Sequence, residues 1–141
     1  MAGLYIHIPF CRQACRYCDF FFSVSLRYVD AYVDSLIQEL QIRAREIPDA
    51  SLETLYLGGG TPSLLSEQNL GKILEAVHRH FSFQKHSEWT LECNPDDLSP
   101  GFLSKLKKQG FNRLSIGIQS FIPRDLELMR RSHTAKQAEQ R

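Results

Sequence analysis

Residues 5–18 read Tyr5-Ile6-His7-Ile8-Pro9-Phe10-Cys11-Arg12-Gln13-Ala14-Cys15-Arg16-Tyr17-Cys18, a short apolar run that leads into three cysteines. The cysteine spacing is Cys-x3-Cys-x2-Cys. Three thiolates on one short loop can hold three corners of a cubane iron–sulfur cluster, which normally takes four cysteine ligands. A missing fourth thiolate leaves one iron open, and an open coordination position is typical of a reactive metal centre rather than a closed structural one.

Other interpretations of these cysteines stay open. A disulfide framework needs an even number of cysteines in a secreted chain; the chain has 4, but Cys93 is far from the other three in sequence. A structural zinc site would need His7 or Cys93 as a fourth ligand, although the second pair of ligands usual in such sites is missing. The cysteines could also have no common role.

Composition narrows the class of protein. A chain of 141 residues suits one domain and not clearly two. Its net charge of +1 argues against nucleic acid as a partner, because no basic patch forms in the sequence beyond Lys105, Lys107 and Lys108. No apolar stretch reaches the length of a transmembrane segment. Thiols without a recognisable export signal predict a reducing compartment, most simply the cytoplasm.

Strand and helix patterns alternate along the chain. Apolar runs predict strands at residues 4–8, 54–57, 88–92 and 113–119. Helical periodicity predicts helices at residues 26–47, 66–81, 99–110 and 123–131. Such repeated strand–helix units joined by short loops predict an α/β fold with a parallel sheet and right-handed crossovers.

Local signals support the helix ends. Ser66 and Ser99 are placed to cap the second and third helices, and Gly110 is placed to end the third. The first helix should carry a Glu39–Arg43 ion pair across one turn. It should stop at Pro48 and Asp49.

Residues capable of chemistry follow the predicted strands. The cysteines come after the first strand and Gly58-Gly59-Gly60-Thr61-Pro62 after the second, while Glu92 and Gln119 end the third and fourth. Ligands bind at the carboxyl ends of the strands in parallel α/β folds. Side-chain alternation directs Glu92 and Gln119 into a shared interior and Cys93 into the helix layer, where it should be a buried apolar side chain.

Five stretches together resemble the radical S-adenosylmethionine (SAM) superfamily, in the branch of HemW-type haem chaperones and coproporphyrinogen III dehydrogenases. They read Tyr5-Ile6-His7-Ile8-Pro9-Phe10-Cys11, Cys15-Arg16-Tyr17-Cys18, Tyr56-Leu57-Gly58-Gly59-Gly60-Thr61-Pro62-Ser63, Glu92-Cys93-Asn94-Pro95 and Asn112-Arg113-Leu114-Ser115-Ile116-Gly117-Ile118-Gln119-Ser120-Phe121. The resemblance implies the first four units of a partial (β/α)6 TIM-like barrel. Residues 1–141 would then be the N-terminal part of the core domain, with the later units and a C-terminal domain beyond Arg141.

The resemblance also implies the cofactors and their ligands. Cys11, Cys15 and Cys18 would hold a 4Fe–4S cluster, and SAM would chelate the open iron. Gly59 and Gly60 peptide groups would meet the SAM ammonium. The remaining positions that match SAM contacts would be Tyr5, Tyr17, Thr61, Glu92, Gln119 and Arg131.

The choice of branch depends mainly on Phe20. The resemblance implies that the dehydrogenase carries another cysteine at this position. Phe20, together with Arg131-x-His133, therefore favours a haem chaperone. The alternative is an oxygen-independent coproporphyrinogen III oxidase (dehydrogenase). The implied partners are haem or a porphyrinogen and an unidentified haem-acceptor protein. The haem-binding segment is expected beyond Arg141, so residues 1–141 alone should not bind haem specifically. Phe20, Phe21 and Phe22 should pack the cysteine loop against the core.

Overall fold

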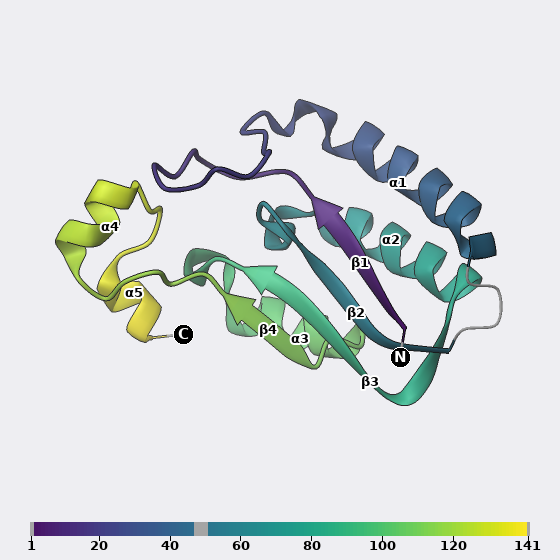
Figure 1. Ribbon diagram of the computed structural model, residues 1–141. Helices are drawn as coiled ribbons and strands as arrows, with labels where there is room; N and C mark the ends of the chain where they lie inside the picture. Colours follow the sequence, from purple (N-terminus) through teal and green to yellow (C-terminus); the bar gives the residue numbers. More distant parts are fainter. Residues whose placement is uncertain (1, 47–50, 141) are drawn as a thin grey trace.

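The computed structural model describes residues 2–46 and 51–140, and their strands form one parallel sheet (Figure 1). The order across the sheet is β1-β2-β3-β4, and each strand is parallel to its neighbour. The strands are β1 (Gly3–Ile8), β2 (Ser51–Gly59), β3 (Ser82–Cys93) and β4 (Arg113–Ile116). Sequential strands that lie side by side and run parallel confirm the predicted α/β fold with strand–helix units.

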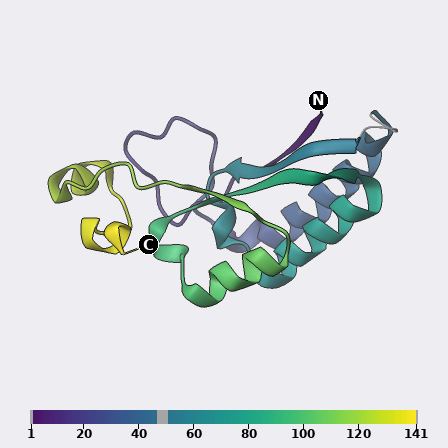
Figure 2. The ribbon, with the colours of Figure 1, turned by 90° about the horizontal axis from the view of Figure 1, so that it is seen from below.

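The helices fall into two groups, seen most clearly from below (Figure 2). Three of them cover one face of the sheet: α1 (Val29–Arg43), α2 (Glu67–His80) and α3 (Pro100–Lys108). Two short ones, α4 (Pro123–Met129) and α5 (Ala135–Glu139), lie beyond the carboxyl ends of the strands, near the cysteine loop. Short 3-10 turns connect these elements: Leu26–Tyr28, Ala44–Glu46, Pro62–Leu64 and Pro95–Asp97. In residues 2–46 and 51–140, no helix has both the length and the apolar composition needed to cross a bilayer.

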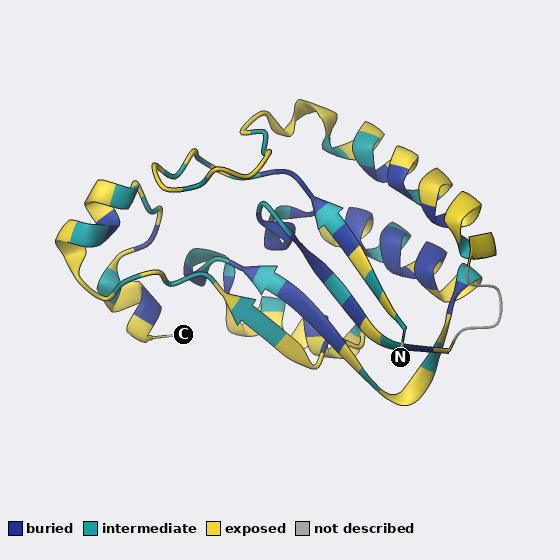
Figure 3. Ribbon diagram, in the orientation of Figure 1, coloured by how far each residue is buried: buried dark blue, intermediate teal, exposed yellow. Residues whose placement is uncertain are grey.

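The hydrophobic core lies between the sheet and the three covering helices (Figure 3). Alternate strand residues supply one side of it, among them Ile6, Ile8, Leu55, Leu57 and Leu91. The helices supply the other side, including Val33, Leu36, Leu40, Ile73, Val77 and Leu106. Each of the larger side chains contributes roughly 1.5–3 kcal/mol when fully buried. The opposite face of the sheet is therefore left for polar and aromatic residues, and this is the face that carries Glu92.

The predicted helix signals are confirmed. The Ser66 hydroxyl accepts from the Asn69 N–H, and the Ser99 hydroxyl accepts from the Phe102 N–H. Gly110 follows α3 with φ +101°. Arg43 Nε and Glu39 Oε1 lie 2.7 Å apart. The stop predicted at Pro48 and Asp49 lies outside the described residues.

Several predicted boundaries differ from the structure. The second and third strands begin earlier than predicted, at Ser51 and Ser82, and the helix predicted over 26–47 is α1 between two 3-10 turns. Two further differences affect site residues. The fourth strand ends at Ile116 instead of residue 119, because the Ile118 N–H turns back to the Ile116 carbonyl and Gln119 has φ +70°. The helix predicted over 123–131 ends at Met129, because Arg130 adopts a left-handed conformation with φ +55°. Gln119 and Arg131 therefore belong to irregular backbone, where the alternation of a strand and the periodicity of a helix no longer apply.

Candidate functional site

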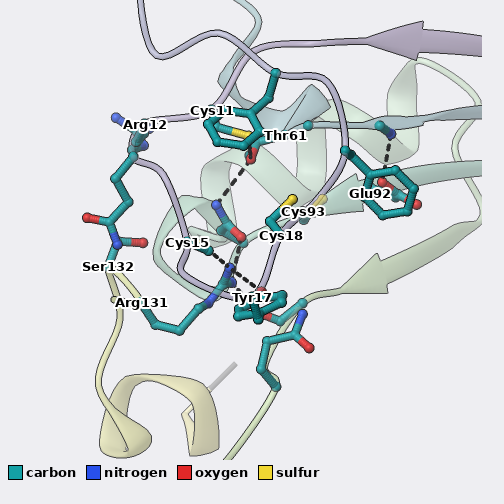
Figure 4. A pocket seen from close by; sticks show the side chains of 18 of the residues that line it. Cys11, Arg12, Cys15, Tyr17, Cys18, Thr61, Glu92, Cys93, Arg131 and Ser132 are labelled. Atoms are coloured by element: carbon teal, nitrogen blue, oxygen red, sulfur yellow. Dashed lines mark hydrogen bonds between the residues drawn. The ribbon is translucent and has the colours of Figure 1, made fainter. Parts of the chain in front are cut away.

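The carboxyl ends of the strands border a cavity of about 520 Å³ (Figure 4). This volume falls in the range of small-molecule sites. All the site residues predicted from the sequence line it, with the exception of Tyr5: Cys11, Cys15, Tyr17, Cys18, Gly59, Gly60, Thr61, Glu92, Gln119 and Arg131. Residues from four strand ends and from the segment after α4 are thus brought to one place.

The cysteine loop, residues 11–22, is anchored at its base and along its length. At the base, the Ser23 N–H donates to the Pro9 carbonyl at 2.7 Å, and the Cys11 N–H donates to the Ser23 carbonyl at 3.0 Å. Further along, the Arg16 N–H donates to the carbonyl of Met129, the last residue of α4, at 3.1 Å. The loop therefore bridges β1 and the end of α4.

The glycine turn after β2 lies directly against the start of the cysteine loop. The Gly60 N–H donates to the Ile8 carbonyl at 2.8 Å, and the Thr61 N–H donates to the Phe10 carbonyl at 2.7 Å. A Cβ on Gly60 would lie 2.6 Å from the Phe10 carbonyl oxygen. Gly59 has φ +113°, and a Cβ there would lie 2.5 Å from the His7 ring. Side chains at these two positions would push the turn away from the loop.

Glu92 is held by two hydrogen bonds at the end of β3. Its Oε1 accepts from the Tyr56 hydroxyl at 2.7 Å, and its Oε2 accepts from the Gly59 N–H at 2.9 Å. The bond to this carboxylate, together with burial, raises the pKa of Tyr56. Because the carboxylate is fixed before any ligand arrives, it forms a preorganised acceptor that faces the cavity.

Tyr5 lies on the same face of the sheet but is not among the residues that line the cavity. Its side chain is 55% exposed, and its hydroxyl hydrogen bonds to His7 Nδ1 at 2.9 Å. The His7 ring in turn contacts Gly59. The sequence identified Tyr5 as a cofactor contact, whereas the structure gives it a place on β1 beside the site.

Arg131 joins the cysteine loop to the ends of β3 and β4. Its Nη2 donates to Asn94 Oδ1 at 2.8 Å and to the Gly117 carbonyl at 2.5 Å. Its Nη1 lies 3.2 Å from the Tyr17 hydroxyl and 3.5 Å from Cys15 Sγ. Its Nε is buried and has no hydrogen-bond partner among the described residues. An unpaired buried donor of this kind is costly.

Asn94 is a cavity residue to which the sequence assigned no role. Besides accepting from Arg131, it lies with Nδ2 3.4 Å from Thr61 Oγ1. Its position two residues after Glu92, on the same side of the strand end, was the available signal. The cavity lining includes further residues outside the predicted ligand set: Arg12, Gln13, Asp19, Phe20, Phe22, Cys93, Ser115, Gly117 and Ser132.

Two predictions about the surroundings of the cysteines had opposite outcomes. Cys93 is 4% exposed and belongs to the hydrophobic core, as predicted. Phe20 and Phe21 are 74% and 82% exposed, so the prediction that they pack the loop against the core was wrong. Backbone hydrogen bonds hold the loop instead: from Cys11 to the Ser23 carbonyl, from Arg16 to the Met129 carbonyl, and from Thr61 to the Phe10 carbonyl.

The donor set fits an iron–sulfur cluster. Cys11, Cys15 and Cys18 are free and partly exposed. Burial raises the pKa of the Cys11 thiol, and raises that of Cys93 to about 12. In residues 2–46 and 51–140, no three His, Cys, Asp or Glu side chains converge as they would around a single metal ion. A cubane cluster binds its thiolates at separate irons, so the three thiols that line the cavity can fit it without converging on one atom.

Comparison with known proteins agrees with this geometry. The family model described as Radical SAM superfamily matches residues 5–140. The haem chaperone HemW of Bacillus subtilis is 41% identical over 138 residues, which cover 96% of this chain and 36% of that protein. The oxygen-independent coproporphyrinogen III oxidase of Salmonella typhimurium is 35% identical over 121 residues, covering 84% of this chain and 26% of that protein.

A solved structure shows the same arrangement of strands and helices. Coproporphyrinogen III oxidase (HemN) from Escherichia coli superposes with a TM-score of 0.88 at 29% identity, over 99% of this chain and 34% of that one. The chain spans about a third of the length of the relatives it matches. Four parallel strand–helix units of a partial TIM-like fold, three cysteines at its mouth and a family match along nearly the whole chain lead to one conclusion: the chain belongs to the radical SAM superfamily.

Proposed function

We propose that residues 1–141 form the cluster- and SAM-binding part of a HemW-like haem chaperone, as the N-terminal part of its radical SAM core. The observation that carries this proposal is that the cysteine loop, the glycine turn and Glu92 border one cavity. Membership of the superfamily implies SAM and a 4Fe–4S cluster, and the residues that bind them are our assignment.

Cys11, Cys15 and Cys18 are proposed as the cluster ligands, with the Thr61 hydroxyl 3.8 Å from Cys11 Sγ as a neighbouring donor. When bound, the cluster supplies an electron to the sulfonium of SAM, which is chemistry that belongs to the cofactors and not to the chain. The task of the chain is to hold both groups in one orientation.

Four features of the chain suit the parts of SAM. A carboxylate such as Glu92 binds hydroxyl or cationic groups, and the guanidinium of Arg131, which lines the cavity, offers a charge-assisted bond to a carboxylate. The N–H groups of Gly59 and Gly60 are bonded within the protein. A ligand ammonium is itself a donor, so its partners at this turn would be backbone carbonyl oxygens. Gln119, in the irregular backbone after β4, adds an amide to the same cavity.

The haem chaperone is favoured over the coproporphyrinogen III oxidase by two observations. Phe20 stands where the resemblance places a cysteine of the oxidase. The identity to the Bacillus subtilis haem chaperone, 41% over 96% of this chain, also exceeds the 35% over 84% found for the Salmonella oxidase. We propose haem as the ligand of the whole protein, another protein as its acceptor, and the cytoplasm as its location, because exposed ligand thiols require a reducing compartment.

Anaerobic reconstitution with iron and sulfide tests the cluster ligands. The chain should take up about four irons with the charge-transfer absorption of a cubane cluster. Replacing Cys11, Cys15 or Cys18 by Ala should abolish that absorption, whereas Cys93→Ala should retain it, since Cys93 lies in the core. A Cys93→Ala variant that folds but takes up no cluster would contradict the assignment.

Two chimeras test the choice of branch. Residues 1–141 would replace the corresponding third of the Bacillus subtilis haem chaperone and of the Salmonella coproporphyrinogen III oxidase. The first chimera should bind cluster and one haem per chain, and the second should not convert coproporphyrinogen III. The matched variant Phe20→Cys in the second chimera examines the discriminating position directly. Conversion by the unmodified second chimera would favour the oxidase.

A further inference from the structure

An ion pair outside the proposed ligands ties the cysteine loop to the end of β3. Arg12, between the first two cysteines, lies with Nη2 2.6 Å and Nε 3.2 Å from Asp97 Oδ1. Asp97 ends the 3-10 turn that follows β3, and its side chain is only 3% exposed. Its other oxygen, Oδ2, accepts from the Ser63 hydroxyl at 2.6 Å.

Besides Arg12, the Ser63 hydroxyl holds the Asp97 carboxylate. Ser63 belongs to the turn after β2, and Asp97 to the turn after β3. Each turn begins at a proline, Pro62 and Pro95, whose restricted φ favours the first residue of a helical turn. A buried carboxylate is stable only where hydrogen bonds and an opposite charge compensate for its lost hydration. Arg12 supplies that charge from the cysteine loop.

This ion pair differs from the surface pairs of the chain. Lys72 and Asp34 are 42% and 60% exposed, and pairs of that kind contribute little because water and salt screen them. In the Arg12–Asp97 pair one partner is almost fully buried, while Arg12 itself is 53% exposed. The ion pair therefore ties an exposed residue of the loop to a buried carboxylate in the 3-10 turn after β3.

Because Arg12 is next to Cys11, the Arg12–Asp97 ion pair also restrains the position of the Cys11 thiol. Arg12 follows Cys11 in the sequence and lines the same cavity (Figure 4). The Arg16 contact to Met129 restrains the other side of the loop, near Cys15 and Cys18. Without the Arg12 contact, Cys11 would be held through its N–H to Ser23 and through the weaker Thr61 contact to its sulfur.

We propose that Asp97 is a positioning residue that acts through Arg12 to hold Cys11 at the geometry the cluster requires. The proposal rests on the assignment of Cys11, Cys15 and Cys18 as cluster ligands. Residues that orient metal ligands affect metal binding without touching the metal, and their loss typically lowers metal affinity about 10- to 100-fold.

Limited trypsin digestion of the iron-free chain tests the docking of the loop by itself. Cleavage after Arg16 is the readout, because Arg16 is retained in every variant. Asp97→Asn and Arg12→Gln should each raise the cleavage rate several-fold, since such cleavage follows the population of the open loop. Asp34→Asn, which breaks an exposed pair elsewhere, is the matched control and should leave the rate unchanged.

Cluster stability tests the role toward the ligands. After anaerobic reconstitution, the rate of cluster loss to a chelator should rise about 10-fold or more in Asp97→Asn and in Arg12→Gln. Arg12→Lys, which keeps the charge, should restore a substantial part of the stability. The double variant should lose its cluster no faster than the single ones, because two residues that act through one contact are not additive.

The outcomes separate positioning from general destabilisation. Additive effects of the two substitutions, or cluster loss that only follows the unfolding temperature of each variant, would overturn the proposal. If Asp97→Asn does not fold, Arg12→Gln and Arg12→Lys test the proposal alone. Wild-type rates of cleavage and of cluster loss in Arg12→Gln would also overturn the proposal. If the wild-type chain takes up no iron, the cluster assignment fails, whereas trypsin cleavage still reports whether Asp97 docks the loop.

Discussion

Cys93 and the loop cysteines differ in chemical reactivity although all four are free thiols. Alkylation requires the thiolate, and burial raises the pKa of Cys93 to about 12, so this thiol is neutral at ordinary pH. We expect iodoacetamide at pH 8 to label Cys11, Cys15 and Cys18 in the native, reduced, metal-free chain, and Cys93 only after unfolding. Mass spectrometry of digested peptides measures this, and rapid native labelling of Cys93 would show that its core position is wrong.

Glu92 provides a second residue-scale prediction, through its place in the proposed SAM site. Glu92→Ala removes the carboxylate that Tyr56 and Gly59 hold in position, and should weaken SAM binding to the cluster-loaded chain by about 1.5–3 kcal/mol, the range for a hydrogen bond to a charged group. Calorimetry under anaerobic conditions measures the affinity. Glu88→Ala, which removes an exposed carboxylate on the same strand, is the control. Equal affinities for wild type and Glu92→Ala would remove Glu92 from the site.

His133 makes stability depend on pH. Its side chain is 2% exposed, Nε2 lies 3.1 Å from the Ile118 carbonyl, and Nδ1 has no partner among the described residues. Burial, aided by the Arg131 charge and opposed by the Ile118 bond and Asp96, lowers the pKa of His133 below 6.5. As pH falls below about 6.5, the unfolded chain gains a proton that the folded chain binds less readily, so folding loses stability until the lowered pKa is passed.

The measurement for His133 is the unfolding temperature between pH 7.5 and 5.5. Wild type should lose more stability over this interval than His133→Gln, which has no group to protonate. His86→Gln replaces an exposed histidine and should keep the wild-type loss. An equal loss in wild type and His133→Gln would place the origin of the pH dependence elsewhere.

At the scale of elements, replacement by alanine should have opposite effects on stability at two glycines, Gly59 and Gly71. Gly59→Ala places a side chain at φ +113° and against the His7 ring, and should destabilise the fold by at least about 1–2 kcal/mol. Gly71→Ala lies within α2, where an added Cβ meets no described atom within 4 Å, and should stabilise the fold by about 1 kcal/mol. Urea unfolding of both variants measures the difference. A stable Gly59→Ala would mean that the turn can relax without the positive φ.

Regular elements were predictable from sequence because their signals are local. The caps at Ser66 and Ser99 and the apolar stripes of the helices depend on neighbours within one turn, and the structure has them as predicted. The ends of β4 and α4 were not predictable in this way. Gln119 and Arg130, neither of them glycine, both have a positive φ, which is uncommon and depends on contacts with distant segments.

At the scale of the whole molecule, topology explains why so much of the candidate site could be predicted. Parallel strands present their carboxyl ends at one edge, so motifs that follow successive strands meet there whatever their separation in sequence. This rule placed the cysteines, Thr61 and Glu92 in one cavity. It could not give the contacts of Arg131 with Cys15 and Asn94, or of Arg12 with Asp97, because these depend on how irregular segments fold back.

The parallel pairing of β1 with β2 affects the order in which the site folds and binds its cluster. All of α1 separates the two strands, and parallel pairings that span so much chain form slowly. The cysteine loop follows β1 at once, yet its anchors at Gly60, Thr61 and Met129 come from segments synthesised later. Metal loading should therefore lag behind folding. In refolding with iron and sulfide, fluorescence of Trp89, the single tryptophan, should recover before cluster absorbance appears. Simultaneous recovery would mean that the loop captures its cluster unaided. The segment of the site that the ribosome makes first would thus be the one that matures last, with its thiols open to oxidation meanwhile.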